Sequence, residues 1–250
     1  MARSPALRWI AANEPLPPAG RALREPNGLL CASEDLSDRR LLEAYRQGIF
    51  PWYSEGQPVL WWSPDPRMVL YLENFRQSRS LTKTVRRVSQ PGGWSITLDR
   101  CFSAVMRACA EPRPDQDGTW ITDDIVAAYS ALAARGLAHS VEIWEPADAA
   151  AGSPQATLIG GLYGVAIGRM FYGESMFARR TDASKVALFS WITLLRSLGF
   201  RMIDCQQRTR HLASLGAAEV DRRVFLDEVA QLISMPPPDW ATVKLEFPMV

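Results

Sequence analysis

The chain has 250 residues, of which 47% are hydrophobic and 22% charged, a composition typical of soluble globular proteins. Its 28 basic and 27 acidic side chains leave a formal net charge of +1, so bulk attraction to nucleic acid is not implied and any basic surface must be local. There is no basic-then-apolar leader, no run of about 18 apolar residues and no CxxC pair among the four cysteines. We therefore predict no signal peptide, membrane span or zinc site, and expect a cytoplasmic protein with reduced thiols.

Hydrophobic periodicity and capping residues predict the elements along the chain. Apolar residues at three- and four-residue steps favour helices, alternation favours strands, and Ser, Thr or Asp can cap a helix N-terminus. The first part gives, in order, an extended proline-rich lead-in over residues 1–30, a helix over 36–48 capped by Ser37, and strand-like runs over 49–53 and 59–62.

The segment Ser63-Pro64-Asp65-Pro66 then interrupts the pattern, because its two prolines fit neither a helix nor a central strand. We place a domain boundary here. The prediction is a small N-terminal domain over residues 1–66 and a larger domain over residues 67–250.

The larger domain is predicted to alternate strands and helices. Its triple proline at 236–238 is expected to end the fold. The predicted elements before the central stretch are a strand over 68–72, a helix over 75–88, a strand over 94–98, a helix over 102–109, a polar loop over 113–118, a helix over 123–134 capped by Thr122, a strand over 139–144 and a turn over 147–153. Those after it are a polar segment over 207–215 and a helix over 222–233.

The central stretch, residues 158–206, has the clearest pattern. A glycine between two strand-like runs is typical of a tight hairpin, because glycine accepts positive φ without strain. The predicted elements are strands over 158–167 and 169–177 joined at Gly168, a helix that Thr181 or Asp182 caps and Gly199 ends, and a last strand over 200–206.

Few polar side chains lie in this stretch, and these are the candidates for chemistry. Alternate residues of a strand share a face, so Asp204 and Gln206 are predicted to point the same way, and Glu174 to share its face with Tyr172 and Met176. A carboxylate in so apolar a strand is costly to bury unless it is paired or functional. The alternative is that Glu174 and Asp204 are edge residues, solvated or bridged to an arginine.

The predicted helix over 75–88 has five basic side chains and no acidic one. Surface helices normally mix the two signs, and a face of one sign suits phosphate contacts. A solvated helix face is the alternative. The five residues are Arg76, Arg79, Lys83, Arg86 and Arg87.

Several common chemistries are not predicted, because the sequence has no GxxxxGK[ST], GxGxxG or GxSxG motif. His139 and His211 could each act as a base, although a lone histidine is more often structural.

Eight blocks, spread from about residue 23 to residue 233, match a known family in order. On them the chain resembles the bacterial leucyl/phenylalanyl-tRNA–protein transferases. Two departures, Ser33-Glu34 in place of Gly-Gly and Ala178 in place of Ser, touch none of the candidate carboxylates. The blocks are LLEAYRQGIFPW (41–52), WWSPDPR (61–67), GTWIT (118–122), GGLYGV (160–165), FYGESMF (171–177), DASK (182–185), IDCQ (203–206) and HLASLGA (211–217).

The resemblance implies an α+β fold with a small N-terminal lobe and a larger lobe similar to the GNAT acyltransferases and the Fem peptidyltransferases, with a mixed sheet flanked by helices. It implies transfer of Leu or Phe from aminoacyl-tRNA to the N-terminal amine of proteins or peptides that begin with Lys or Arg, which marks them for N-degron-dependent degradation. We expect Met to be transferred as well. The donor is already an activated ester, so no ATP, metal or other cofactor is expected.

The resemblance also assigns roles to residues by position. Asp204 and Gln206 would be the catalytic pair, with Glu174 as the acidic neighbour of the acceptor. Trp52 and Trp120 would hold the terminal adenosine of the tRNA. The aminoacyl pocket would contain Leu162, Phe171, Met176, Trp191 and Ile203.

The chemistry needs orientation more than a strong base, because an α-amine with a pKa near ~8 is already partly neutral at pH 7. We expect the carbonyl of Gln206 to accept a hydrogen bond from the attacking amine while Asp204 holds its NH2 group. Two alternatives stay open. One is an acyl-CoA-dependent N-acetyltransferase, although its Q/RxxGxG/A turn is not found; the other is an adaptor that clamps basic N-termini with Glu174 and Asp204.

Overall fold

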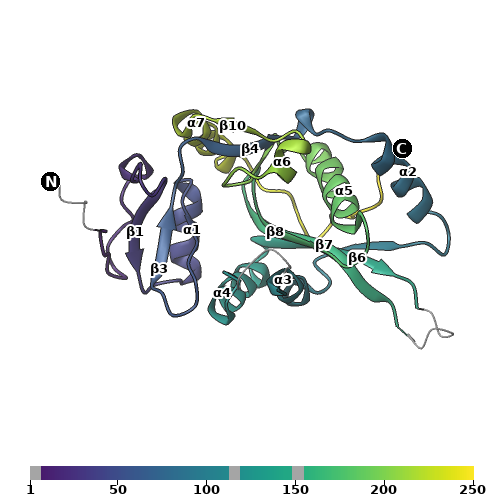
Figure 1. Ribbon diagram of the computed structural model, residues 1–250, viewed down its shortest axis with the longest axis horizontal. Helices are drawn as coiled ribbons and strands as arrows, with labels where there is room; N and C mark the ends of the chain where they lie inside the picture. Colours follow the sequence, from purple (N-terminus) through teal and green to yellow (C-terminus); the bar gives the residue numbers. More distant parts are fainter. Residues whose placement is uncertain (1–6, 113–118, 148–154) are drawn as a thin grey trace.

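The computed structural model describes residues 7–112, 119–147 and 155–250. The loop predicted over 113–118 and nearly all of the turn predicted over 147–153 lie outside these residues. Two sheets organise the chain, with the smaller one at the N-terminal end of the molecule (Figure 1). Among the described residues, none of the helices has the length and apolar content needed to cross a membrane.

Residues 19–62, here called the small lobe, contain a three-stranded antiparallel sheet in the order β1-β3-β2 and one α-helix. The Ser37 side chain accepts a hydrogen bond from the Arg40 backbone nitrogen, so the predicted cap is confirmed. The predicted lead-in is wrong in part, since it contains a 3-10 helix and the start of a strand. The elements are η1 (Ala19–Arg21), β1 (Leu29–Ser33), α1 (Asp38–Arg46), β2 (Phe50–Pro51) and β3 (Val59–Trp62).

The large lobe is built on a seven-stranded mixed sheet in the order β10-β4-β9-β8-β7-β6-β5. Neighbouring strands pair antiparallel, apart from the parallel pair β8–β9. The α+β class with a mixed sheet is therefore confirmed. The strands are β4 (Arg67–Tyr71), β5 (Ser95–Leu98), β6 (Ala138–Glu145), β7 (Thr157–Ile167), β8 (Met170–Ala178), β9 (Met202–Asp204) and β10 (Ala218–Val220).

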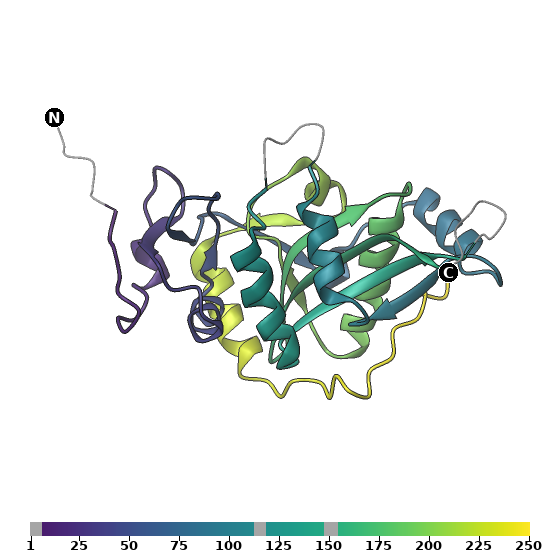
Figure 2. The same ribbon diagram turned by 90° about the horizontal axis from the view of Figure 1, so that it is seen from below.

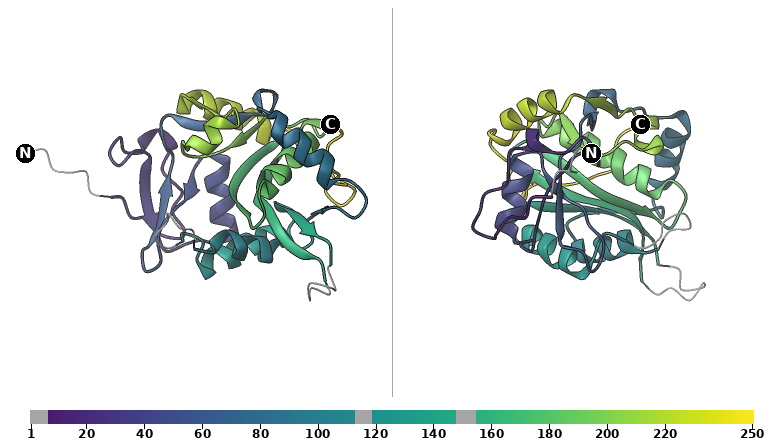
Figure 3. Two further views of the ribbon diagram at one scale, coloured as in Figure 1. Left: turned by 45° about the vertical axis from the view of Figure 1, so that its right-hand side comes forward. Right: turned by 60° about the vertical axis from the view of Figure 1, so that its left-hand side comes forward.

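Helices cover both faces of this sheet (Figure 3). α2 and α5 pack into one apolar core, and α3 and α4 pack into a second core on the opposite face. Thr122 caps α4 as predicted, and Gly168 and Gly199 have the expected positive φ. The helical elements are η2 (Leu72–Asn74), α2 (Arg79–Val88), α3 (Phe102–Ala110), α4 (Asp123–Ala134), α5 (Ala183–Ser197), α6 (Arg210–Ser214) and α7 (Arg222–Ile233).

Two element boundaries near the candidate residues and one capping bond differ from the sequence prediction. The helix predicted from residue 75 begins at Arg79, after the Ser78 cap, so Arg76 precedes it. The strand predicted to residue 206 ends at Asp204, because Gln206 has φ +54, which no β-strand allows. Asp182 is the N-cap residue of α5, but its side chain bonds Lys185 Nζ at 2.8 Å and makes no capping bond.

The triple proline does not end the fold, so that prediction is wrong. Residues 234–250, here called the C-terminal strap, run from α7 along the molecule to α2 (Figure 2). The strap forms no helix or strand, so hydrophobic periodicity could not predict it. It is anchored by buried Leu245 and by a 2.9 Å hydrogen bond from Arg86 Nε to the main-chain oxygen of Val250.

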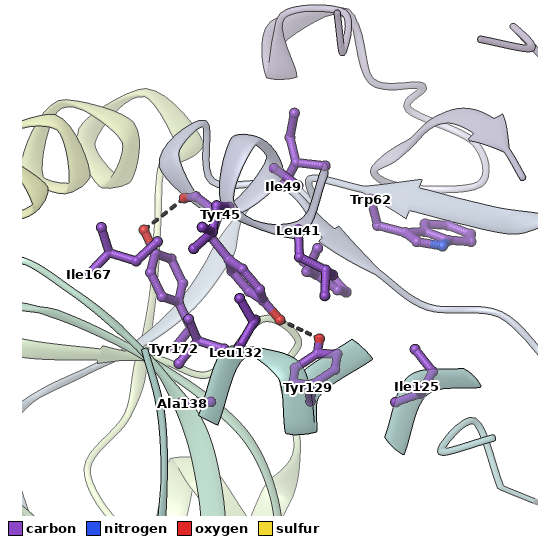
Figure 4. Packing of buried hydrophobic residues seen from close by; sticks show 14 of the residues in the cluster. Leu41, Tyr45, Ile49, Trp62, Ile125, Tyr129, Leu132, Ala138, Ile167 and Tyr172 are labelled. Carbon is purple, nitrogen blue, oxygen red and sulfur yellow. Dashed lines mark hydrogen bonds between the residues drawn. The ribbon is translucent and has the colours of Figure 1, made fainter. Parts of the chain in front are cut away.

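The two lobes share one apolar core (Figure 4). Tyr45 of α1 reaches from the small lobe to Tyr129 of α4, and their hydroxyls are hydrogen-bonded. The Tyr172 hydroxyl of β8 donates to the main-chain oxygen of Tyr45 at 2.7 Å. These contacts fix the small lobe against the sheet next to the candidate site.

Candidate functional site

A cavity of about 470 Å³ opens where β8 and β9 diverge. These strands pair only at Phe171↔Ile203 and Tyr172↔Asp204. β9 then ends and Gln206 turns the chain away, and residues 173–176 and 205–207 all line the opening. The small lobe closes part of the cavity with residues 50–52.

One side of the cavity is apolar, and we call its lining the apolar chamber. All five residues predicted for an aminoacyl pocket lie here, together with Leu188, which prediction missed although it is three residues from Trp191 on α5. Apart from Met176, these side chains are at least nine-tenths buried. The apolar chamber consists of Leu162, Phe171, Met176, Leu188, Trp191 and Ile203.

Gly164 on β7 makes room for this chamber. A Cβ atom added at Gly164 would lie 2.5 Å from Cζ of Phe171 and 2.2 Å from the main-chain oxygen of Tyr172. Any side chain at this position would therefore displace the Phe171 ring.

A β-bulge places Glu174. Tyr163 pairs with Ser175 and Gly164 with Gly173, so Glu174 is the extra residue of β8. A bulge shifts strand alternation by one residue and re-aims side chains. Met176, predicted on the face of Glu174, lies instead with the apolar chamber, so that prediction is wrong.

Glu174 is surrounded by phenols, and we call this group, Glu174 with Tyr45, Tyr129 and Tyr163, the carboxylate site. The Tyr45 hydroxyl donates to Oε1 at 2.7 Å, and the Tyr129 hydroxyl, which is also bonded to that of Tyr45, lies 3.2 Å from Oε2. The Tyr163 hydroxyl is buried without a hydrogen-bond partner among the described residues, and Tyr163 lines the cavity with Glu174. Burial raises the pKa of Glu174 to about 7, against the opposing effect of the Tyr45 hydrogen bond.

Asp204 makes a buried ion pair. Arg67 Nε lies 2.8 Å from Oδ1 and Nη2 lies 2.6 Å from Oδ2, and both side chains have 0% exposure. The guanidinium lies over the rings of Phe50 and Phe225, 4.7 Å from each centroid. Neither Glu174 nor Asp204 is on an edge strand; the alternative of an arginine bridge is correct for Asp204 and wrong for Glu174.

Gln206 reaches the cavity, and Asp204 does not line it. Their predicted position on one strand face is wrong, because the strand ends between them. Oδ1 of Asp204 accepts from the Gln206 backbone nitrogen at 2.9 Å, while Nε2 of Gln206 lies 3.4 Å from the main-chain oxygen of Asp204. The carboxylate therefore holds the backbone of Gln206 and not its NH2 group.

Trp52 and Trp120 both line the cavity, as does His211 of α6. Trp52 is 42% exposed, and its main-chain oxygen accepts from Trp62 Nε1 at 2.7 Å. Burial and the nearby Lys185 charge lower the pKa of His211, so its neutral form is favoured at pH 7.

The five basic residues are exposed but do not line the cavity. Four of them lie on the face of α2 opposite buried Leu81, Val85 and Val88, and Arg76 precedes the helix. α2 packs on α5, which separates it from the apolar chamber. The four on the helix face are Arg79, Lys83, Arg86 and Arg87.

Sequence reasoning missed Arg67, Tyr45, Tyr129 and Tyr163 as site residues. Arg67 and Tyr45 fall within the recognised blocks, but their partners lie 137 and 129 residues away in sequence. Nothing in a strand or helix pattern pairs such positions. Among the described residues, no group of three or more His, Cys, Asp or Glu side chains is placed to hold a metal ion.

Comparisons with known proteins cover both lobes. A family profile described as leucyl/phenylalanyl-tRNA protein transferase matches residues 69–230, and one described as the N-terminal domain of that protein matches residues 34–65. The leucyl/phenylalanyl-tRNA–protein transferase of Ralstonia pickettii (strain 12J) is 55% identical over 234 residues, 92% of this chain and 91% of that protein. The protein of the same name from Paraburkholderia xenovorans (strain LB400) is 52% identical over 246 residues, 96% and 97% of the two chains. Among solved structures, FemX is similar with a TM-score of 0.46 and 10% identity, covering 72% of this chain and 66% of FemX.

Proposed function

Because the chain belongs to the leucyl/phenylalanyl-tRNA–protein transferase family, we propose that the cavity between β8 and β9 is where it transfers leucine or phenylalanine from aminoacyl-tRNA to proteins. The enzyme is an aminoacyltransferase, and its acceptors are proteins that begin with Arg or Lys, as the N-end rule requires. One observation supports this proposal: an apolar chamber and a half-buried carboxylate open into the same cavity beside Gln206.

The apolar chamber holds the side chain of the donor. Its lining rejects charged side chains, because they would lose their hydration without a partner. Apolar side chains of similar size differ there by only about 1–3 kcal/mol, so methionine is transferred as well as leucine and phenylalanine.

Gln206 orients the reaction. The acceptor amine attacks the ester carbonyl, the new amide bond forms, and the ribose hydroxyl of the tRNA leaves. The Gln206 side chain lines the cavity, and its carbonyl can accept a hydrogen bond from the amine. Asp204 acts through Gln206 as a positioning residue, because Arg67 and the Gln206 backbone already bind its two carboxylate oxygens.

Glu174 recognises the basic first residue of the acceptor. A cation beside it gains a charge-assisted hydrogen bond in a site with little water. The phenols of Tyr45 and Tyr129 hold the carboxylate in place. These phenols and the residues of the apolar chamber belong to cores on opposite faces of the sheet, which keeps the donor and acceptor side chains apart.

The tRNA is held at two places. Trp52 and Trp120 stack on the terminal adenosine at the cavity, as aromatic side chains commonly do with unpaired bases. Arg76 and the basic face of α2 contact phosphates, since their exposed cations face solvent together.

Three further assignments belong to this proposal. The larger lobe is GNAT-like, which its mixed sheet with helices on both faces supports. The domain boundary lies at residue 66/67, a division supported by the separate sheets and the separate family profiles. The location is cytoplasmic, where charged tRNAs are used.

The test follows labelled leucine from Leu-tRNA into a peptide that begins with Arg, with a Glu-starting peptide as control. Transfer to the Arg peptide alone is expected. Binding of the peptide without transfer would favour an adaptor, and acetyl-CoA turnover without tRNA would favour an N-acetyltransferase; either result would refute the proposal.

A further inference from the structure

A pair of stacked tryptophans joins the C-terminal strap to the apolar chamber. Trp240 of the strap lies with its ring centroid 5.8 Å from that of Trp191, at an interplanar angle of 20°. Trp191 is fully buried and lines the cavity, whereas no described residue of the strap does. The strap therefore reaches the chamber from behind its wall.

Rings hold the Trp191 indole in place. Its Nε1 has no hydrogen-bond partner among the described residues, so no polar contact there fixes its orientation. Phe171, also part of the chamber, contacts it edge-on with centroids 5.1 Å apart. Because aromatic pairs prefer offset or edge-on geometries, the position of Trp191 depends on where its neighbouring rings lie.

Trp240 is itself well anchored. It lies 4.0 Å from the His139 ring, whose Nδ1 is 2.7 Å from Oδ2 of Asp99, and 6.1 Å from the ring of Phe200. Farther along the strap, buried Leu245 packs into the same core. The indole of Trp240 thus provides a fixed surface for Trp191.

We propose that Trp240 is a specificity-determining residue, which limits the depth of the apolar chamber by holding Trp191 against it. The inference rests on the proposed donor role of the chamber. Protein cores are close-packed, so removing the Trp240 indole leaves a space into which Trp191 can move. The chamber then deepens, and larger donor side chains gain relative to smaller ones. The strap lies beyond residue 230, where the match to the family profile ends.

The test compares kcat/KM for Leu-tRNA and Phe-tRNA with one Arg-starting peptide, in the full-length wild type and Trp240→Ala. The Phe-to-Leu ratio should rise about threefold or more, a fraction of the roughly 10- to 200-fold discrimination that one methylene group gives in an apolar pocket, with KM for the peptide unchanged. Trp240→Phe, which keeps a stacking ring, should stay close to wild type.

Leu245→Ala is the matched control, because it loosens the same strap at a residue with no ring to stack on Trp191. It should lower the melting temperature and leave the donor ratio unchanged. An unchanged ratio in folded Trp240→Ala, or an equal shift in Leu245→Ala, would overturn the proposal. If Trp240→Ala does not fold, Trp240→Leu must shift the ratio in the same direction, and no shift there overturns it too. Absence of transfer by the wild type would instead refute the proposed function.

Discussion

The apolar chamber and the carboxylate site open into one cavity, but they belong to cores on opposite faces of the sheet and are built in different ways. The chamber is made of side chains from neighbouring strands and from one face of α5, all within residues 162–203. The carboxylate site needs a bulge on β8, one tyrosine from α4 and another from α1 of the small lobe. The first region is part of one core, and the second depends on how the two lobes pack.

Because of this difference, the chamber selects donors by shape and the carboxylate site selects acceptors by charge. The chamber can discriminate only by size and hydration, so its choice among apolar donors is modest. The carboxylate site holds a single carboxylate, that of Glu174, whose charge decides recognition. Gln206 lines the same cavity, and its backbone is bound by Asp204 of the Arg67–Asp204 pair.

Breaking that central pair should have the largest effect on the molecule. Arg67→Ala leaves the buried Asp204 carboxylate without its partner, and we expect a loss of about 3–5 kcal/mol in the free energy of unfolding, measured by urea denaturation. The matched control is Arg135→Ala, which removes an exposed pair with Asp38 and should cost about 1 kcal/mol or less. Equal losses in the two variants would contradict the importance assigned to the buried pair.

Gln206→Ala should come next, with turnover reduced by ~10²-fold, the usual cost of losing a positioning group. Its free energy of unfolding should change little, because its side chain faces the cavity. Asp204→Ala should also lose turnover, but it should unfold more easily as well, since it leaves Arg67 buried and unpaired. Near-normal turnover in folded Gln206→Ala would remove this residue from the mechanism.

The two regions also differ in how far the sequence predicts them. The chamber residues other than Leu188 were predicted, but only because the resemblance to a known family assigned them by position. The carboxylate site was predicted only as Glu174. A bulge leaves no mark in residue periodicity, and the Tyr45–Tyr129 contact joins segments 84 residues apart. Arg67, the partner of Asp204, was missed because it too is distant in sequence. The strap was missed because the residues that pack it on the core, Trp240 and Leu245, follow no regular period.

The pH dependence should distinguish the carboxylate site from the chamber. Since the pKa of Glu174 is raised to about 7 in the folded protein, the folded state binds more protons than the unfolded state between about pH 4.5 and pH 7. The free energy of unfolding should therefore fall with rising pH across this range, while use of Arg acceptors should improve as Glu174 ionises.

Glu174→Gln is the reference for both measurements, because it keeps the shape and removes the charge. It should flatten the stability profile between pH 4.5 and pH 7. In this variant, the pH dependence of kcat/KM should reflect only the deprotonation of the acceptor amine. Profiles that match those of the wild type would show that Glu174 does not titrate there.

The smallest effect is expected outside both regions, on the basic face of α2. Arg79→Ala combined with Lys83→Ala should weaken the binding of Leu-tRNA and of Phe-tRNA by the same factor. It should also flatten the log–log dependence of affinity on salt by about 0.7–0.9 per lost contact. The double variant should use a minimal aminoacyl-adenosine donor, which has no phosphate, as efficiently as the wild type does. An unchanged salt slope would make this face an ordinary solvated one.

The division of the cavity into a donor side and an acceptor side is tested most directly by one specificity ratio. We would measure kcat/KM for leucine transfer to a peptide that begins with Arg and to the same peptide beginning with citrulline, which has the shape of Arg without its charge. The wild type should prefer Arg, and Glu174→Gln should lose about tenfold or more of that preference while its Leu-to-Phe donor ratio stays the same. A variant that keeps the preference for Arg, or one whose donor ratio moves with it, would contradict the division.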